Sequence, residues 1–470
     1  MPQEIKNLKR LSFLARVLNP DFWQTLIWWQ FAGRAPQILA LDAGINPFCP
    51  EPIRPQRSHD EIGGLDQAWH QLRIVRRAKS HDCCGPICTG FYNADMAQVF
   101  DICIRGGGIV GRTLALLLAR ERLRVALVEQ AQRLPGSDLS VSGDVRAYAL
   151  NARSRTLLES LRCWPDAESA TEVLAMEVKG DDGGAVNFSA TELKVPGLTW
   201  IVDVPALEAR LAEAVRFQPL IELMTTAPTA ALTVICEGRS SSTRAEFGID
   251  FDVTPYPQTA IAARLQCEKP HAQTAFQWFI QDEILAFLPI DGSHGKSVAI
   301  VWSVLRERVP ALLAQSAQDF CQQLEAASHE QLGKLELTSS RSAWPLQSAH
   351  ATRWVGRHAQ GAWALAGDAA HNVHPLAGQG LNLGLSDVAA LADTLGQREY
   401  WRSVDDEKLL RRYERSRKSE VAVMDATMDA LQRLFSQHSA SWQAVRNWGM
   451  NGFERSGVLK LWVARQAMGC

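Results

Sequence analysis

Residues 100–129 read FDICIRGGGIVGRTLALLLARERLRVALVE, and they predict a strand, a glycine-rich turn, a helix and a second strand. Phe100 to Ile104 and Arg124 to Val128 are short β-rich runs, while Thr113 to Ala119 is an apolar helical stretch. Two strands joined by a crossover helix form a parallel βαβ unit. This stretch therefore predicts an α/β fold.

The turn after the first strand carries the pattern G-x-G-x-x-G. Gly106 and Gly108 allow a tight turn and the close approach of a pyrophosphate to the helix N-terminus at Ile109–Val110, and Gly111 lets the helix pack on the sheet. Glu129 closes the second strand about 20 residues further on, where an acid is expected to bind the ribose hydroxyls of an adenosine. Strand, glycines, helix and acid together predict dinucleotide binding.

A second informative stretch, residues 362–386, reads AWALAGDAAHNVHPLAGQGLNLGLS. Its apolar run ends in Gly367-Asp368, and a Gly-Gln-Gly turn at 378–380 opens a new helix. A carboxylate at a strand end accepts hydrogen bonds from the hydroxyls of a sugar-like chain. The backbone N–H groups from Gly380 to Asn382 can face a negatively polarised ring edge, which the positive end of the helix dipole favours. The stretch predicts a seat for the ribityl chain and pyrimidine edge of a flavin.

Several residues of this stretch are candidate flavin contacts: Gly367, Asp368, Pro375, Gly378, Gln379, Gly380, Leu381 and Asn382. His374 and Pro375 are also candidates to line the cavity, where the proline would stiffen the loop. The spacing of His371 and His374 suits a metal, but no third ligand is near in the sequence, so we expect structural histidines and no metal. No catalytic acid or base is predicted, because oxygen transfer depends on the flavin more than on a side chain.

From Met96 onward the chain resembles the ubiquinone-biosynthesis hydroxylases, a branch of the class A FAD-dependent aromatic monooxygenases related to p-hydroxybenzoate hydroxylase. Besides the two motifs above, residues 144–151 (DVRAYALN) resemble the segment whose arginine contacts FAD, which points to Arg146. Residues 236–244 (CEGRSSSTR) match the family pattern A-D-G-x-x-S-x-x-R, with Glu237 in place of the aspartate.

Three features depart from the family pattern. Arg105 is a charge where the strand end is usually apolar. Glu237 keeps the charge of the usual aspartate, but its longer side chain shifts the oxygens, so we expect an indirect contact with the cofactor. The connection from Leu220 to Val234 is short, which suggests a trimmed adenine side.

The resemblance implies an FAD-binding Rossmann-like (βαβ) domain, an interleaved antiparallel-sheet substrate domain and a helical C-terminus. Strand-like apolar segments at 275–279, 284–289 and 297–304, with a turn at Asp291-Gly292, fit the antiparallel sheet. The expected boundaries are an atypical extension at 1–95, an FAD domain at 96–165, 205–250 and 345–400, a substrate domain at 166–204 and 251–344, and a helical region at 401–470.

The resemblance also implies an activity. NAD(P)H would reduce the FAD, and O2 would form a flavin C4a-hydroperoxide that hydroxylates the ring of a polyprenylated phenol. Only one dinucleotide motif is present, so the nicotinamide is expected to bind transiently without a domain of its own. One alternative is a flavin enzyme for another substrate, either a hydroxylase of a small aromatic acid or a prenyl reductase. Another is a non-catalytic prenyl-binding or scaffold protein, which the Gly367-Asp368 segment argues against.

Composition agrees with such an enzyme. A chain of 470 residues suggests two or three domains, and its net charge of −2 gives no pull toward nucleic acid or an anionic membrane. Ten scattered cysteines and no secretory signal predict a reducing cytoplasm. No apolar run approaches the ~20 residues of a spanning helix. The segment Val458 to Arg465 is expected to pack on its own domain, with docking on a membrane surface or on a ubiquinone-biosynthesis complex as the alternative.

Residues 1–95 lack clear periodicity and contain the cluster CCGPIC at 83–88. This spacing does not suit a four-ligand zinc site, because no matching pair of ligands follows. Met96 stands just before the first strand, where a protein of this family normally begins. We interpret the preceding segment as an over-extended reading frame; a genuine extension with a faintly presequence-like start is the alternative.

Overall fold

The computed structural model describes residues 100–129, 145–180, 184–359, 361–372, 379–435 and 456. The chain divides into two units, residues 1–93 and 94–470, and all of the described residues belong to the second unit. Several sequence predictions concern residues outside the described part: the N-terminal extension with its cysteines, His374, Pro375, Gly378 and the segment 458–465. The expected domain boundaries stay predictions.

The first sheet has six strands in the order β16-β17-β9-β1-β2-β8 and is parallel except at its β16 edge. Its strands are β1 (Phe100–Arg105), β2 (Val125–Val128), β8 (Ile221–Met224), β9 (Ala230–Ile235), β16 (Val355–His358) and β17 (Gly361–Leu365). Helix α3 (Ile109–Arg120) connects β1 to β2, which confirms the predicted βαβ unit. The order places β1 and its glycine turn at the centre of the sheet.

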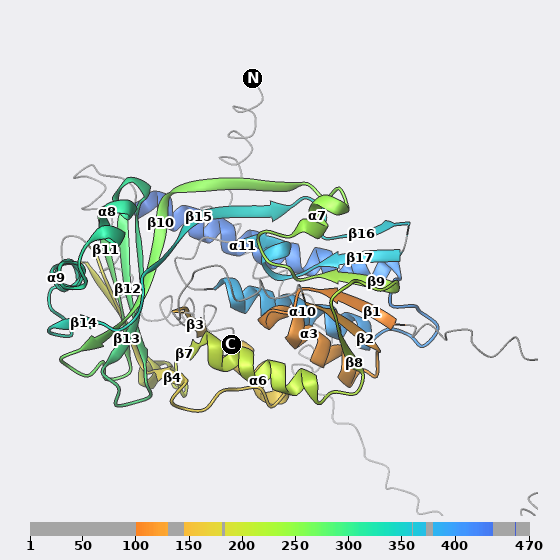
Figure 1. Ribbon diagram of the computed structural model, residues 1–470, viewed down its shortest axis with the longest axis horizontal. Coiled ribbons are helices and arrows are strands. Elements are labelled where there is room, and N and C mark those ends of the chain that lie inside the picture. Colours follow the sequence, from red (N-terminus) through yellow and green to blue (C-terminus); the bar gives the residue numbers. More distant parts are fainter. Residues whose placement is uncertain are drawn as a thin grey trace, which may run out of the picture. The chain divides into compact units, whose positions relative to one another are not determined.

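Three further helices pack around α3 and its neighbours: α6 (Val204–Arg216), α10 (Gly380–Gly396) and α11 (Glu407–Phe435). Leu114 and Leu118 of α3 are fully buried, together with Leu385 and Leu391 of α10. Apolar residues at helical spacing thus form one core between the helices and the parallel sheet. In Figure 1, α3, α10 and α11 lie beside this sheet.

The second sheet has nine strands and is antiparallel apart from the β5–β11 pair. In order they are β18 (His371–Asn372), β15 (Ser342–Ala351), β10 (Phe251–Cys267), β13 (Ser297–Leu305), β12 (Glu283–Ile290), β11 (Thr274–Ile280), β5 (Ala175–Lys179) and β6 (Ala185–Ser189), with β14 (Leu335–Leu337) on β10. The strands predicted at 275–279, 284–289 and 297–304 are confirmed as β11, β12 and β13. At the predicted turn, Asp291 and Gly292 have φ of 66° and 76°.

One face of this sheet is covered by α8 (Val309–Ala314) and α9 (Ala317–Ala327). Side chains alternate between buried and half-buried positions along β12, and its buried Leu285 and Phe287 share a core with Phe320 of α9. The strands β10 and β15 are the longest pair, and they run side by side from this sheet toward α7 (Ser242–Glu246) (Figure 1).

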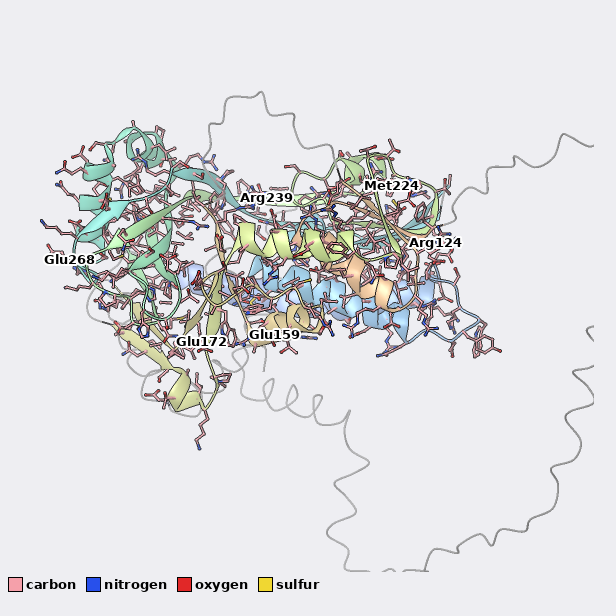
Figure 2. The ribbon with its side chains drawn as sticks, turned by 60° about the horizontal axis from the view of Figure 1, so that its bottom comes forward. Arg124, Glu159, Glu172, Met224, Arg239 and Glu268 are labelled. Atoms are coloured by element: carbon pink, nitrogen blue, oxygen red, sulfur yellow. The ribbon has the colours of Figure 1, made fainter. Side chains whose placement is uncertain are left out.

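A small antiparallel sheet, β3-β7-β4, connects the two larger sheets: β4 and β7 pack on β12, while β3 packs on α10. It consists of β3 (Ala147–Leu150), β4 (Ala170–Val173) and β7 (Thr199–Asp203), and it is accompanied by α4 (Ala152–Ser160) and α5 (Ala190–Leu193). Figure 2 shows Met224, the last residue of β8, and Arg124, which precedes β2, at the opposite end of this unit from Glu268. No helix in the described ranges has the length and apolar character needed to cross a membrane.

Candidate functional site

The two predicted motifs meet at Val110, in the first turn of α3. A Cβ added at Gly367 would lie 3.3 Å from Val110 Cγ1, and one added at Gly384 would lie 3.0 Å from Val110 Cγ2. The Val110 side chain therefore packs directly on both glycines. Segments that are far apart in the sequence come together here, as the two-part cofactor site requires.

Two glycines of the G-x-G-x-x-G turn are required by close backbone contacts, and the third borders open space. Gly106 has φ +119°, and a Cβ there would lie 2.5 Å from the carbonyl oxygen of Cys236. A Cβ on Gly111 would lie 1.9 Å from the carbonyl oxygen of Gly106, so this glycine lets the helix approach the strand. A Cβ on Gly108 would meet nothing within 4 Å. The open side at Gly108 lies beside the N–H groups of the first helical turn, which have no acceptor within the helix, and it fits a pyrophosphate.

Glu129 lies directly after β2, as predicted. Its Oε1 accepts hydrogen bonds from Nε of Arg112 at 3.1 Å and from Nη2 of the same residue at 2.9 Å. The middle glycine, Gly107, makes room for this side chain, because a Cβ there would lie 2.4 Å from Glu129 Cγ. The sequence analysis did not predict the role of Arg112. One indication of it was present in the sequence: Arg112 is a positively charged residue in the first turn of the helix that follows the glycines.

Asp368 lies in the turn η3 (Gly367–Ala369) that follows β17, where Gly367 has φ +63°. Burial raises the pKa of the Asp368 carboxyl above its usual range, while His371 and Arg239 oppose that effect. Arg244 fixes the backbone of the turn by donating from Nη1 to the carbonyl oxygen of Ala369 at 2.9 Å. A partly desolvated carboxyl on a fixed turn is suited to accept hydrogen bonds from the hydroxyls of a ribityl chain.

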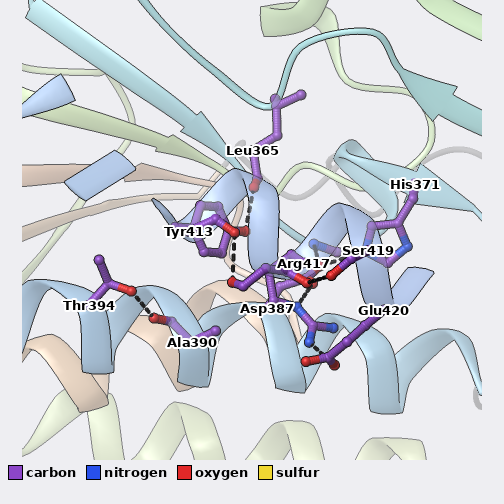
Figure 3. Close-up of polar contacts among 11 residues, drawn as sticks. Leu365, His371, Asp387, Ala390, Thr394, Tyr413, Arg417, Ser419 and Glu420 are labelled. Carbon is purple, nitrogen blue, oxygen red and sulfur yellow. Dashed lines mark hydrogen bonds and ion pairs between the residues drawn. The ribbon is translucent and has the colours of Figure 1, made fainter. Parts of the chain in front are cut away.

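Behind this turn lies a buried polar cluster formed by Asp387, His371 and Arg417 (Figure 3). The Asp387 side chain is 0% exposed, and its Oδ2 lies 2.9 Å from the Gly367 nitrogen and 2.6 Å from His371 Nε2. Arg417 Nε donates to Oδ1 at 2.8 Å. Burial alone would raise the pKa of Asp387, but His371 and Arg417 outweigh it and hold the pKa below its usual range.

This cluster ties helix α11 to the candidate flavin turn. Tyr413 donates from its hydroxyl to the carbonyl oxygen of Leu365 at 2.8 Å, and Trp354 stacks on the His371 ring with centroids 4.9 Å apart. His371, which the sequence analysis expected to be a structural histidine, is bonded to the Asp387 carboxylate. Sequence reasoning missed Asp387 and Arg417, although a lone acid on the apolar face of α10 was a visible signal.

Helix α10 begins at Gly380, so the N–H groups from Gly380 to Asn382 have no acceptor within the helix. The Asn382 side chain itself is turned into the protein. Its Nδ2 donates to the carbonyl oxygen of Ala149 at 2.8 Å, and its Oδ1 accepts from Ser154 Oγ at 2.7 Å. The backbone of this turn remains the candidate for the pyrimidine edge of the flavin, while the asparagine side chain fixes α10 against β3 and α4.

Arg105 and Glu237, the two residues that depart from the family pattern, interact with each other. Arg105 Nε lies 3.4 Å from Glu237 Oε1, and its Nη1 lies 2.8 Å from Glu246 Oε2. Glu237 also accepts hydrogen bonds from the hydroxyls of Ser241 at 2.7 Å and Thr243 at 2.6 Å. These bonds outweigh burial and lower the pKa of Glu237. The strand-end cation and the glutamate therefore form an ion pair with each other.

Three more predicted residues belong to the described part of the chain: Arg146, Gln379 and Leu381. Arg146 is exposed and directly precedes β3, and Gln379 and Leu381 are half-buried at the start of α10. Arg264 donates to the carbonyl oxygen of Arg146 at 3.5 Å. The five cysteines in the described ranges are buried free thiols.

Comparison with known proteins agrees with this geometry. Residues 225–427 match the family described as FAD binding domain. The chain is 30% identical to the ubiquinone hydroxylase UbiL of Rhodospirillum rubrum, covering 82% of this chain and 93% of that protein. It is 32% identical to the 3-demethoxyubiquinol 3-hydroxylase of Escherichia coli, covering 79% of this chain and 99% of that protein. The chain belongs to the ubiquinone-biosynthesis hydroxylase family.

The fold is shared with solved FAD-dependent monooxygenases. One is a probable FAD-dependent monooxygenase from Pseudomonas aeruginosa, with 23% identity and a TM-score of 0.60 over 75% of this chain and 99% of that one. Another is the p-nitrophenol 4-monooxygenase of Pseudomonas putida, with 16% identity and a TM-score of 0.61 over 79% of this chain and 98% of that one. Family membership makes this protein an FAD-dependent monooxygenase.

Proposed function

We propose that this protein hydroxylates the aromatic ring of a polyprenylated phenol in ubiquinone biosynthesis, using NAD(P)H and O2. The observation that carries the proposal is the 32% identity to a 3-demethoxyubiquinol 3-hydroxylase over 99% of that protein. The contact of the two cofactor motifs at Val110 supports it, because an FAD-dependent reaction needs both halves of the site.

In this proposal the chain holds FAD along the edge where the motifs meet. The open side of Gly108 would hold the pyrophosphate, and Glu129 would bind the adenosine ribose. Asp368 would bind the ribityl chain, the first turn of α10 would hold the pyrimidine edge, and Arg146 would contribute a further contact. When bound, FAD supplies the hydride acceptance and the oxygen chemistry. The protein binds and orients the reactants and excludes water.

The substrate side of the proposed site is apolar. Leu288 and Ile290 of β12 and Ala147 and Ala149 of β3 are partly buried and pack against the same apolar cluster, formed by Val173, Ile201 and Ala275. Because β3 packs on α10, we propose that these apolar side chains lie near the bound flavin. Such a wall accepts a prenylated phenol, and it keeps water away from the reacting centre. We further propose a cytoplasmic location with peripheral membrane contact, because a polyprenyl chain partitions into the bilayer.

The purified, FAD-loaded protein tests the proposal when it is given NADH or NADPH, O2 and a prenylated phenol. Expected are substrate-stimulated NAD(P)H oxidation and a stoichiometric product that is one oxygen heavier by mass spectrometry. A product that gains hydrogen without oxygen would indicate a prenyl reductase. Turnover with small aromatic acids, and none with the prenylated phenol, would show that the substrate is a small aromatic acid. A protein that does not take up FAD would support the non-catalytic alternative.

A further inference from the structure

Arg112 is a cation placed where a helix N-terminus disfavours positive charge. It is the residue of α3 whose backbone N–H makes the first intrahelical bond, to the Gly108 carbonyl oxygen at 3.0 Å. The positive end of the helix dipole repels a guanidinium at this position, and a neighbouring anion offsets that repulsion. In the described part of the chain that anion is Glu129.

The guanidinium of Arg112 holds the Glu129 carboxylate from one side only. Nε and Nη2 both donate to Oε1, at 3.1 and 2.9 Å, while Nη1 donates to the carbonyl oxygen of Glu208 on α6 at 3.3 Å. The Arg112 side chain is 17% exposed and that of Glu129 35% exposed, so the pair lies at the rim of the site. Oε2 of Glu129 has no hydrogen bond with any described residue.

The space for this arrangement comes from Gly107. A Cβ at that position would lie 2.4 Å from Glu129 Cγ and 2.5 Å from Oε1, so the carboxylate lies against the backbone of the glycine turn. Three constraints therefore act on one side chain: the backbone at Gly107, the two donors of Arg112, and the α6 carbonyl that fixes Arg112 itself.

We propose that Arg112 is a positioning residue for the adenosine ribose of FAD. It occupies Oε1 of Glu129 and holds the carboxylate in one rotamer, so that Oε2 stays directed to accept a ribose hydroxyl. The inference rests on the proposed ribose contact of Glu129. A flexible glutamate would lose side-chain entropy when it bound the ribose, and Arg112 removes that cost before the cofactor arrives.

The test is FAD affinity of the full-length apoprotein, measured by quenching of flavin fluorescence. Arg112→Gln should weaken FAD binding about 3- to 10-fold, which is at or below the value of one charge-assisted hydrogen bond. The loss should disappear with the FAD analogue that carries 2′-deoxyadenosine, and in a Glu129→Gln background. Arg120→Gln is the matched control on the same helix, since that guanidinium donates to Ser160 Oγ away from the glycine turn.

Three results overturn the inference. Wild-type FAD affinity of Arg112→Gln would show that the guanidinium does not matter for binding. An equal loss for FAD and the 2′-deoxy analogue would point to a phosphate contact or to a general loss of stability, which the apoprotein melting temperature reports separately. Wild-type FAD affinity of Glu129→Gln would refute the proposed ribose contact itself, a failure that is distinct from that of Arg112.

Discussion

Replacing Asp387 by asparagine tests whether the buried cluster holds the flavin turn. Asn keeps the shape of the side chain but loses the charge, and its amide nitrogen cannot accept a hydrogen bond. Oδ2 of Asp387 faces the Gly367 N–H and His371 Nε2, while Oδ1 faces Arg417 Nε. Whichever way the amide is oriented, at least one of these partners loses its acceptor.

The expected cost follows from the burial of both charges. The side chains of Asp387 and Arg417 are 0% and 1% exposed, and Nη2 of Arg417 already has no hydrogen-bond partner among the described residues. Removing one member of such a buried pair costs about 3–5 kcal/mol. We expect the lower end of this range, because Arg417 keeps the more exposed Glu420 as a partner of its Nη1. Since native proteins have only about 5–15 kcal/mol of stability, the midpoint of denaturation should shift strongly.

The assay is urea denaturation of the apoprotein, followed by measurement of FAD affinity under conditions where the variant is folded. We expect a lower midpoint at unchanged slope, and weaker FAD binding because the Gly367 turn loses its anchor. Asp393→Asn, an exposed position on the same helix, should stay within about 0.5 kcal/mol of wild type. Wild-type stability and FAD affinity of Asp387→Asn would refute the assigned role of the cluster.

Three more changes test other parts of the site. The pKa of Asp368 is raised in the folded protein, so its ionisation costs stability as the pH rises from the ordinary aspartate pKa through the folded value. Asp368→Asn should therefore stabilise the apoprotein at neutral pH, as measured by calorimetry, and weaken FAD binding about 10- to 100-fold, as measured by titration. Undiminished FAD binding would contradict the assigned ribityl contact. Gly108→Ala should leave the apoprotein folded but weaken FAD binding, because the added methyl group enters only the open side of the turn. Gly111→Ala should lower the stability of the apoprotein, because the methyl group clashes with the Gly106 carbonyl oxygen. The same melting temperature and FAD affinity for both variants would contradict this explanation. Arg105→Val should cost about 1 kcal/mol or less, because Glu237 keeps its bonds from Ser241 and Thr243 and the pair of Arg105 with the exposed Glu246 is screened by solvent. The cost should shrink in about 0.5–1 M salt. A salt-independent loss in denaturation would mean that packing, not charge, is responsible.

Patterns that are local in the chain were predictable from the sequence. The β1–α3–β2 unit was recognised because glycines, an apolar helix and an acid stand at fixed spacing over 30 residues, 100–129. The strands β11, β12 and β13 were found because short apolar runs are separated by turn residues such as Asp291-Gly292. The small sheet of β3, β4 and β7 was missed, since its short strands carry no strong period and form only through pairing with one another.

Fold class, the two cofactor motifs and the family could all be inferred from the residues alone. The ion pairs could not be inferred from the sequence, and only the structure shows them. They are Arg112 with Glu129, Arg105 with Glu237, and Arg417 with Asp387. Backbone periodicity and glycine spacing act through neighbouring residues, whereas an ion pair depends on where distant segments pack. Arg417 and Asp387 lie on different helices, and only the packing of α11 against α10 makes them neighbours.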